Sequence, residues 1–133
     1  MAKKTYTYAA GKRKSASARV RLFSGRGENE VNKVPAEKYF PGKVEKVALN
    51  KPFELTESGN KYYFTARLIG SGKAAQLTAL AHALSKALAL AGGDKYRSPL
   101  KKAGLLTRDS RIRQRRMVGT GGKSRRAKQS PKR

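Results

Sequence analysis

Positively charged side chains crowd the last quarter of the chain, where 13 Lys or Arg in residues 101–133 stand against the single acid Asp109. Arginine offers a planar fork of N–H donors that matches two phosphate oxygens at once, and lysine adds a mobile point charge. Few apolar residues follow Val118, so this segment cannot bury enough surface to offset the entropy of its ordering. We therefore expect an extended basic tail that orders against a polyanion, with phosphate contacts from Lys101, Lys102, Arg108, Arg111, Arg113, Arg115, Arg116, Lys123, Arg125 and Arg126.

A second basic group lies near the start of the chain. Its members could form an ordinary solvated face, which is the usual meaning of a run of charges. The whole chain, however, carries 32 Lys or Arg and 8 Asp or Glu, a net charge of +24, and adjacent like charges repel one another even at physiological salt. We therefore also expect phosphate contacts from Lys12, Arg13, Lys14, Arg19 and Arg21.

The segment Gly70-Ser-Gly-Lys73 suggests a nucleotide-binding loop, because glycines before a helix expose free amides to phosphate. The spacing opposes a P-loop, since Arg67 occupies the position of its first glycine and Ala74 follows the lysine in place of Ser or Thr. A glycine pair before a helix is more often a packing device. Contact between an RNA phosphate and Gly70, Gly72 and Lys73 remains our expectation.

The residue types needed for catalysis or metal binding are scarce. The chain has no cysteine, and its one histidine, His82, has no carboxylate or second histidine within a helical turn. We expect His82 to be partly covered or to face solvent, and Glu28 and Glu30 to balance neighbouring cations or lie in water. The sequence therefore predicts no enzyme, no metal and no cofactor.

Several elements must position these residues. Residues 15–23 alternate strictly, which predicts a strand with Ala16, Ala18, Val20 and Leu22 inward and the two arginines outward. A turn at 24–27 would lead to a returning strand at 28–32, forming a hairpin. Pro35 would open a helical turn ending before Pro41-Gly42, and Val44, Val47 and Ala48 have the spacing of a second short helix.

The middle of the chain predicts a second hairpin, with strands at 51–55 and 61–69 around the turn 57–60. After Gly72 the period changes to 3.6, which predicts one long helix that ends at Gly92-Gly93. Its apolar stripe would be Leu77, Leu80, Ala81, Leu84, Leu88 and Ala91. Most aromatic residues fall at strand or helix-end positions and are expected in the core, whereas Tyr6 and Tyr8 remain open as base-stacking residues.

Together these elements predict an α+β fold, a two-layer structure with helices on one face of the sheet. Residues 1–100 would form one globular RNA-binding domain, and residues 101–133 the extended basic C-terminal tail. No apolar run is long enough to span a membrane, and the start of the chain lacks the apolar stretch of a signal peptide. We expect a cytosolic protein with no membrane partner.

The residues also resemble a known family, the universal small-subunit ribosomal protein S-nine, bacterial type, over nearly the whole chain. The resemblance lies in Gly11-Lys-Arg-Lys-Ser-Ala-Ser-Ala-Arg-Val20, in Val31-Asn32 and Tyr39-Phe40, in the helix entry 70–76, and above all in Leu100-Lys-Lys-Ala-Gly-Leu-Leu-Thr-Arg-Asp-Ser-Arg111. The chain departs from the family pattern at Ser71, where a glycine is usual, in the glycine-rich segment 118–125, and in its ending Ser-Pro-Lys-Arg.

The resemblance implies a fold similar to the second domain of ribosomal protein S-five, with a left-handed βαβ crossover. It implies a structural protein in the head of the small subunit of a cytoplasmic bacterial ribosome, bound to the 3′ major domain of the rRNA and to neighbouring head proteins, and not a homo-oligomer. It also implies that the tail end, Lys128, Lys132 and Arg133, contacts the anticodon stem-loop of the P-site tRNA.

Two other functions compete with this interpretation. A net charge of +24 would bind any duplex by counterion release, so a protein that compacts DNA is the first alternative. It predicts DNA binding as tight as rRNA binding. An enzyme is the second alternative, because the expected fold is shared with some small-molecule kinases. The wrong P-loop spacing and the scattered acids oppose it.

Overall fold

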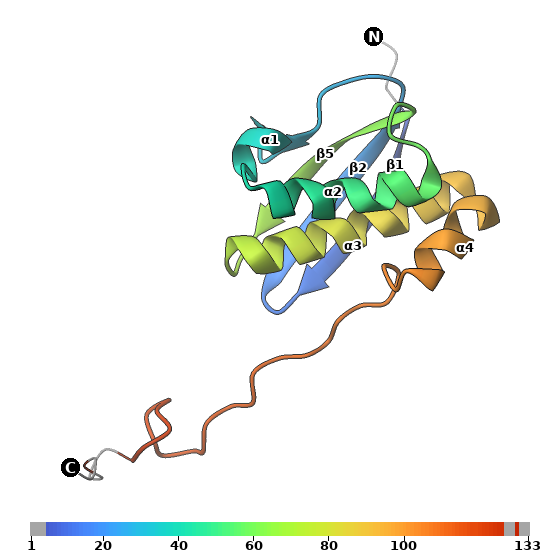
Figure 1. The fold of residues 1–133 in the computed structure, drawn as a ribbon. Coiled ribbons are helices and arrows are strands. Elements are labelled where there is room, and N and C mark those ends of the chain that lie inside the picture. Colours follow the sequence, from blue (N-terminus) through green and yellow to red (C-terminus); the bar gives the residue numbers. More distant parts are fainter. Residues whose placement is uncertain (1–4, 127–129, 131–133) are drawn as a thin grey trace.

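A five-stranded sheet forms one layer of the protein, and helices form the other. The structure is a computed structural model that describes residues 5–126 and 130. Along the chain the elements are β1 (Tyr6–Arg13), β2 (Ala16–Ser24), β3 (Glu30–Val31), β4 (Val34–Pro35), α1 (Ala36–Tyr39), α2 (Lys43–Thr56), β5 (Tyr62–Ile69), α3 (Lys73–Gly92) and α4 (Asp94–Lys102). Figure 1 shows these elements, with the chain beyond α4 running away from the body.

The strands lie in the order β1-β2-β5-β3-β4. Strand β2 pairs antiparallel with β1 on one side and with β5 on the other, and β3 pairs parallel with β5. The predicted alternation in β2 is confirmed, because Val20 is fully buried while Arg19 and Arg21 are exposed. Val20 stands in register with Ala9 of β1 and Ala66 of β5, and all three are buried.

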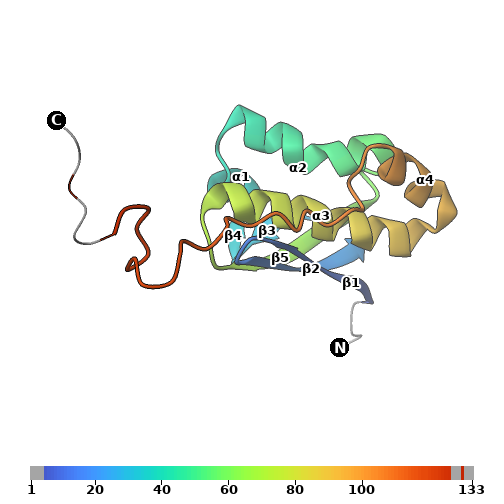
Figure 2. The same ribbon diagram turned by 90° about the horizontal axis from the view of Figure 1, so that it is seen from below.

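The helices cover one face of the sheet, as Figure 2 shows from below. Helix α3 packs on β1 and β2, and α2 packs against α3. Four alanines at four-residue spacing make the buried side of α3 narrow: Ala75, Ala79, Ala83 and Ala87. Gly11 of β1 lies directly beneath them, where a Cβ would overlap Ala79 O and come within 2.8 Å of Ala83 N. Small side chains thus let the helix lie close to the strand.

The expected α+β class is confirmed, but the first predicted hairpin is wrong. Residues 28–32 do not pair with β2, because β1 and β5 occupy both of its edges. Strand β1 escaped prediction because Ala9, Ala10 and Gly11 give its inner side a weak apolar signal. The likeness to the second domain of ribosomal protein S-five, with its left-handed crossover, stays a prediction.

The predicted strand at residues 51–55 is also wrong. These residues form the second half of α2, which runs through Pro52 as one helix of 14 residues. Its buried side is Leu49, Pro52, Phe53 and Thr56, a helical spacing, whereas Val44 and Val47 are 81% and 65% exposed. Burial of this apolar stripe outweighs the hydrogen bond that a proline cannot make.

The long helix is confirmed as α3, and the chain turns at Gly93, which has a φ of 62°. A further helix, α4, was not predicted; it buries Tyr96 and Leu100 and ends at Lys102. Gly104, with a φ of 75°, closes it, and the Leu105 N–H donates to Leu100 O over 3.1 Å. No helix or strand follows from 103 to 126. Within the described ranges, no helix is long and apolar enough to cross a membrane.

Candidate nucleic-acid interface

The face of the sheet opposite the helices carries a set of basic side chains. Because side chains alternate along a strand, the arginines of β2 and β5 project away from the core, and Arg19 stands in register with Arg67. Together with Tyr8 and Lys33 they line a shallow hollow of about 780 Å³. We call this set the sheet face: Tyr8, Arg19, Arg21, Lys33 and Arg67.

The cations of the sheet face have no acidic partners among residues 5–126. The ion pairs in that range are those of Asp109 with Arg13 and Arg111. One carboxylate, Glu30, lines the hollow beside the four cations. An exposed surface with this excess of guanidinium groups attracts phosphate.

Aromatic rings cross the same face in a row. Tyr6 of β1, Phe23 of β2 and Tyr63 of β5 are neighbours in register, with ring centroids 5.7 Å and 5.1 Å apart. The Arg21 guanidinium carbon lies 5.1 Å from the centroid of the Tyr6 ring. Tyr8 is 50% exposed and makes no ring contact with other described residues, so its ring is the more accessible of the two tyrosines considered for base stacking.

The segment that follows α4, residues 105–111, is held against the body; we call it the tail root. Leu105 and Leu106 are half-buried against the core. The His82 Nε2 atom lies 3.2 Å from Leu106 O and, with a hydrogen on that nitrogen, donates to the carbonyl. His82 is thus half-buried on α3 and has a bonding partner that lies 24 residues away.

Burial lowers the pKa of His82 below its usual value of 6.5. The bond to Leu106 O acts in the opposite direction, and the charges of Lys86 and Arg108 lower the pKa further. The other ring nitrogen, Nδ1, is buried and has no hydrogen-bond partner in the described part of the chain. A proton there would be a buried charge without an acceptor, so the neutral ring is the favoured form.

A cluster of three charged residues closes the tail root onto the end of β1. Arg111 donates to both carboxylate oxygens of Asp109, over 3.0 Å and 2.8 Å. The Arg13 Nε lies 3.5 Å from Asp109 Oδ2, and the same guanidinium donates to Arg111 O. The hydrogen bonds from Arg111 hold the pKa of Asp109 far below its usual range, so Asp109 is ionised at any physiological pH.

This cluster concerns two of the predicted phosphate contacts. The Arg13 side chain is 15% exposed and its guanidinium already has two partners in the tail root. The Arg111 side chain, in contrast, is 84% exposed, which leaves donors free for solvent or a ligand. Arg13 therefore has a structural role at this site, and phosphate contacts from either residue stay predictions.

The loop before α3 is occupied by packing contacts. Lys73 Nζ donates to Tyr39 O over 2.9 Å and lies 3.5 Å from the centroid of the Tyr39 ring. A Cβ on Gly70 would come within 2.5 Å of Ser15 O, and its φ of 82° also favours glycine. Ser71 adopts a φ of 51°, which explains why a glycine would suit that position. RNA contact by Gly70, Gly72 and Lys73 stays a prediction.

The remaining candidates lie on the surface. Lys12 and Lys14 stand at the end of the β1–β2 hairpin, and Lys101 and Lys102 in the last turn of α4. The exposed tail residues are Arg108, Arg113, Arg115, Arg116, Lys123, Arg125 and Arg126. The expected tRNA contacts, Lys128, Lys132 and Arg133, lie outside the described residues.

Two cations of the sheet face were missed by sequence reasoning. Arg67 could have been found, because inward Phe64, Ala66 and Leu68 require the residue between the last two to face outward. Lys33 could not, since it lies in a turn with a φ of 66° and no periodic pattern places it.

Known proteins are similar to this chain over most of its length. The family model described as ribosomal protein S9/S16 matches residues 11–133. Small ribosomal subunit protein uS9 of Desulfotalea psychrophila is 49% identical over 116 residues, which are 86% of this chain and 88% of that protein. The protein of the same name from Maridesulfovibrio salexigens is 41% identical over 119 residues, which are 90% of this chain and 91% of that protein.

Proposed function

Because this chain belongs to the ribosomal protein S9/S16 family, we propose that it is a non-enzymatic structural component of the small ribosomal subunit in the bacterial cytoplasm. In this role it binds the 3′ major domain of the small-subunit rRNA in the head. One observation carries the RNA part of the proposal: Arg19, Arg21 and Arg67 project from the helix-free face of the sheet without an ion pair among the described residues.

Recognition on the sheet face uses phosphates more than bases. Arginines on neighbouring strands form a rigid array, because each is fixed by the register of the sheet, and a rigid array selects the phosphate spacing of a folded RNA. The tail lacks helix and strand from 103 to 126, so it follows the RNA surface and becomes ordered with it. The tail root sets where this path begins.

The tail end extends the proposal to tRNA. The family resemblance assigns Lys128, Lys132 and Arg133 to the anticodon stem-loop of the P-site tRNA. Deletion of Lys132-Arg133 is then expected to weaken retention of P-site tRNA while subunit assembly stays nearly intact, because the rest of the tail still anchors the protein. Loss of assembly in that truncation would contradict this division of roles.

The rRNA contact is tested with the triple variant Arg19→Gln/Arg21→Gln/Arg67→Gln. Filter binding to a transcript of the 3′ major domain, repeated at several salt concentrations, gives the slope of log K against log[salt]. Each lost phosphate contact reduces that slope by about 1, so a reduction of about 2 to 3 is expected.

A charge-matched control comes from exposed lysines on the helical side, Lys38→Gln/Lys43→Gln/Lys51→Gln. An equal loss in both triple variants would mean that only net charge matters. Competition with a DNA duplex of the same length addresses the alternative function: displacement of the transcript at equal concentration would favour a DNA-compacting protein.

A further inference from the structure

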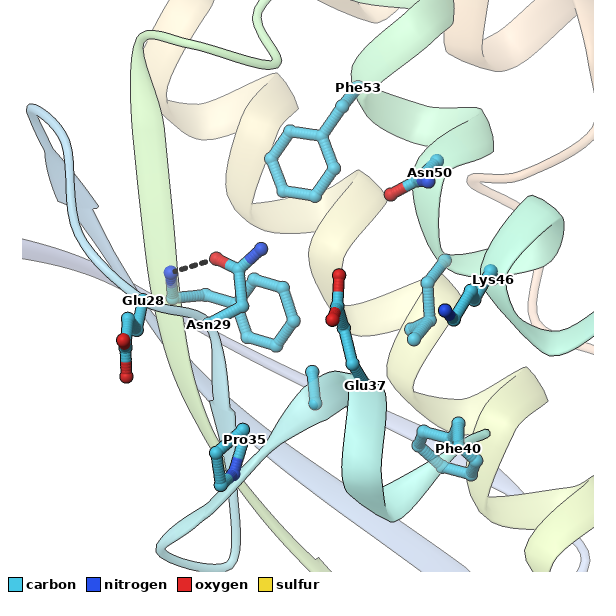
Figure 3. A pocket seen from close by; sticks show the side chains of 11 residues that line it. Glu28, Asn29, Pro35, Glu37, Phe40, Lys46, Asn50 and Phe53 are labelled. Atoms are coloured by element: carbon cyan, nitrogen blue, oxygen red, sulfur yellow. Dashed lines mark hydrogen bonds between the residues drawn. The ribbon is translucent and has the colours of Figure 1, made fainter. Parts of the chain in front are cut away.

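Acidic residues line a groove beside helix α2, on the helical side of the molecule. Two adjoining hollows of about 360 Å³ and 270 Å³ share Asn29, Asn50 and Phe53 and so form one continuous depression. It lies between α1 and α2 on one side and β5 with the segment before β3 on the other (Figure 3). We call this depression the α2 groove.

The charge of the α2 groove is opposite to that of the chain. Its lining contains the four carboxylates Glu28, Glu37, Glu54 and Glu57 and the single cation Lys46. The whole chain has 8 acidic residues and a net charge of +24, so half of its acids lie at this one depression. The arrangement repels phosphate and attracts a cation.

These carboxylates have no cationic partner inside residues 5–126, where the ion pairs all involve Asp109. Figure 3 shows the Glu37 carboxylate pointing from α1 toward the middle of the hollow, with Asn50 projecting from α2 across from it. The Asn29 side-chain oxygen is already occupied, since it accepts from Phe64 N over 3.2 Å. The groove therefore offers carboxylate and amide oxygens that are free to accept hydrogen bonds.

The wall of the groove is aromatic. Phe40, Phe53 and Phe64 line it, and the rings of Phe53 and Phe64 are stacked with centroids 6.2 Å apart. A lysine or arginine side chain fits such a surface, because its aliphatic stem packs on rings while its charged end reaches the carboxylates. A metal ion does not, because within the described ranges no three acidic or histidine side chains come close enough to hold one.

We propose that the α2 groove receives a lysine or arginine side chain from a basic segment of a neighbouring protein, and not RNA. The inference rests on the proposed function, since it takes that neighbour to be another protein of the same subunit. The chain would then use opposite faces for two partners: the sheet face for rRNA and the α2 groove for protein.

The experiment places a photoreactive benzophenone amino acid at Asn50, which is exposed at the groove. Small subunits containing the labelled full-length chain are purified, irradiated and digested, and the cross-linked peptide is sequenced. We expect a link to another protein, within a stretch that holds at least two Lys or Arg in five residues. A second labelled chain, with the group at Lys46, covers the case in which the first position disturbs folding.

The charge requirement is tested by adding Glu28→Gln/Glu37→Gln to the labelled chain. We expect the cross-link yield to fall at least fivefold. The matched control Glu30→Gln/Asp94→Asn removes two acids that lie outside the groove lining, and it should leave the yield within a factor of two.

Other results would overturn the proposal. A link to rRNA, a link to a second copy of this chain, no link from either position, or a yield insensitive to Glu28→Gln/Glu37→Gln each excludes a basic protein segment in the groove. If the labelled chain is present in the small subunit, these outcomes leave the proposed function standing. If the chain is absent from the small subunit, both proposals fail together.

Discussion

The Arg13 guanidinium lies against the Asp109 carboxylate, with 3.5 Å between Arg13 Nε and Asp109 Oδ2. The same guanidinium donates to the carbonyl of Arg111, a residue 98 positions further along the chain. The contact joins the end of the first strand to the start of the tail. The direction in which the tail leaves the body is therefore a property of the folded core, set before any RNA is bound.

Asp109→Asn should loosen the tail root. The variant removes the charge that holds Arg13 and Arg111, while it keeps the size of the side chain. We expect amide hydrogen exchange in residues 105–111 to become roughly two- to fivefold faster, the range for a solvent-accessible ion pair. Exchange followed by mass spectrometry measures this, with Asp94→Asn as the control. Unchanged exchange would show that Leu105 and Leu106 hold the segment alone.

His82 should make stability depend on pH between neutrality and mild acid. Its pKa is lowered in the folded protein, so the unfolded chain binds a proton that the folded chain does not. The free energy of unfolding is then highest above the usual pKa of 6.5 and falls as the pH drops from 7 toward 5. Asp109 stays ionised throughout this window, because its pKa is held far below it.

His82→Gln separates the titration from the hydrogen bond. The glutamine amide can still donate to Leu106 O, but it does not titrate, so the fall in stability between pH 7 and 5 should shrink. His82→Phe should also lower stability at pH 7, by about 1 kcal/mol for the lost bond. Urea denaturation at pH 5, 6 and 7 gives these values. An identical pH dependence in the wild type and His82→Gln would assign it to another group.

Gly11→Ala should destabilise the core. The added Cβ would meet the backbone of α3 at Ala79 O and Ala83 N, and neither atom can move without shifting the helix. We expect a loss of about 1 to 3 kcal/mol, as for other overpacked sites. Thermal or urea denaturation measures it. Gly59→Ala is the control, because nothing lies within 4 Å of its added Cβ, and its effect should stay below about 0.5 kcal/mol.

Asn32→Ala should weaken the edge of the sheet beside β5. The Asn32 side chain accepts from Leu68 N over 2.8 Å and donates to Leu68 O over 3.1 Å. Two lost hydrogen bonds correspond to a destabilisation of about 2 kcal/mol, measured by urea denaturation. Asn32→Asp keeps the acceptor and loses the donor, so it should fall between. Asn60→Ala, in an exposed turn, serves as the control.

The sequence predicts elements well where one face is strongly apolar. The alternation of Ala18, Val20 and Leu22 and the stripe of Leu80, Leu84 and Leu88 both locate buried sides that the structure confirms. Strand β1 was missed because the close approach of α3 requires Gly11, and a glycine carries no hydrophobic signal. Helix α2 was divided at Pro52, because local propensity does not reveal that Pro52 and Phe53 are buried together.

The candidate interface shows the same limit. Alternation alone places Arg19 and Arg21 outside the sheet, and the same rule applied to β5 adds Arg67. The bonds from Arg13 and His82 to the tail root follow from no periodic pattern, since they join residues far apart in the chain. Basic residues of similar appearance therefore divide into those that hold the fold and those that are free to bind.

The contact between Gly11 and α3 has a mechanical consequence for the tail. Arg13 stands two residues beyond Gly11 on the same strand, and His82 stands beside Ala83 on the same helix. The closest approach of strand and helix thus sets the spacing between the two side chains that grip the tail root. A methyl group added at Gly11 would widen that grip, so damage in the interior of the core would be transmitted as a change in the angle at which a distant, flexible segment emerges.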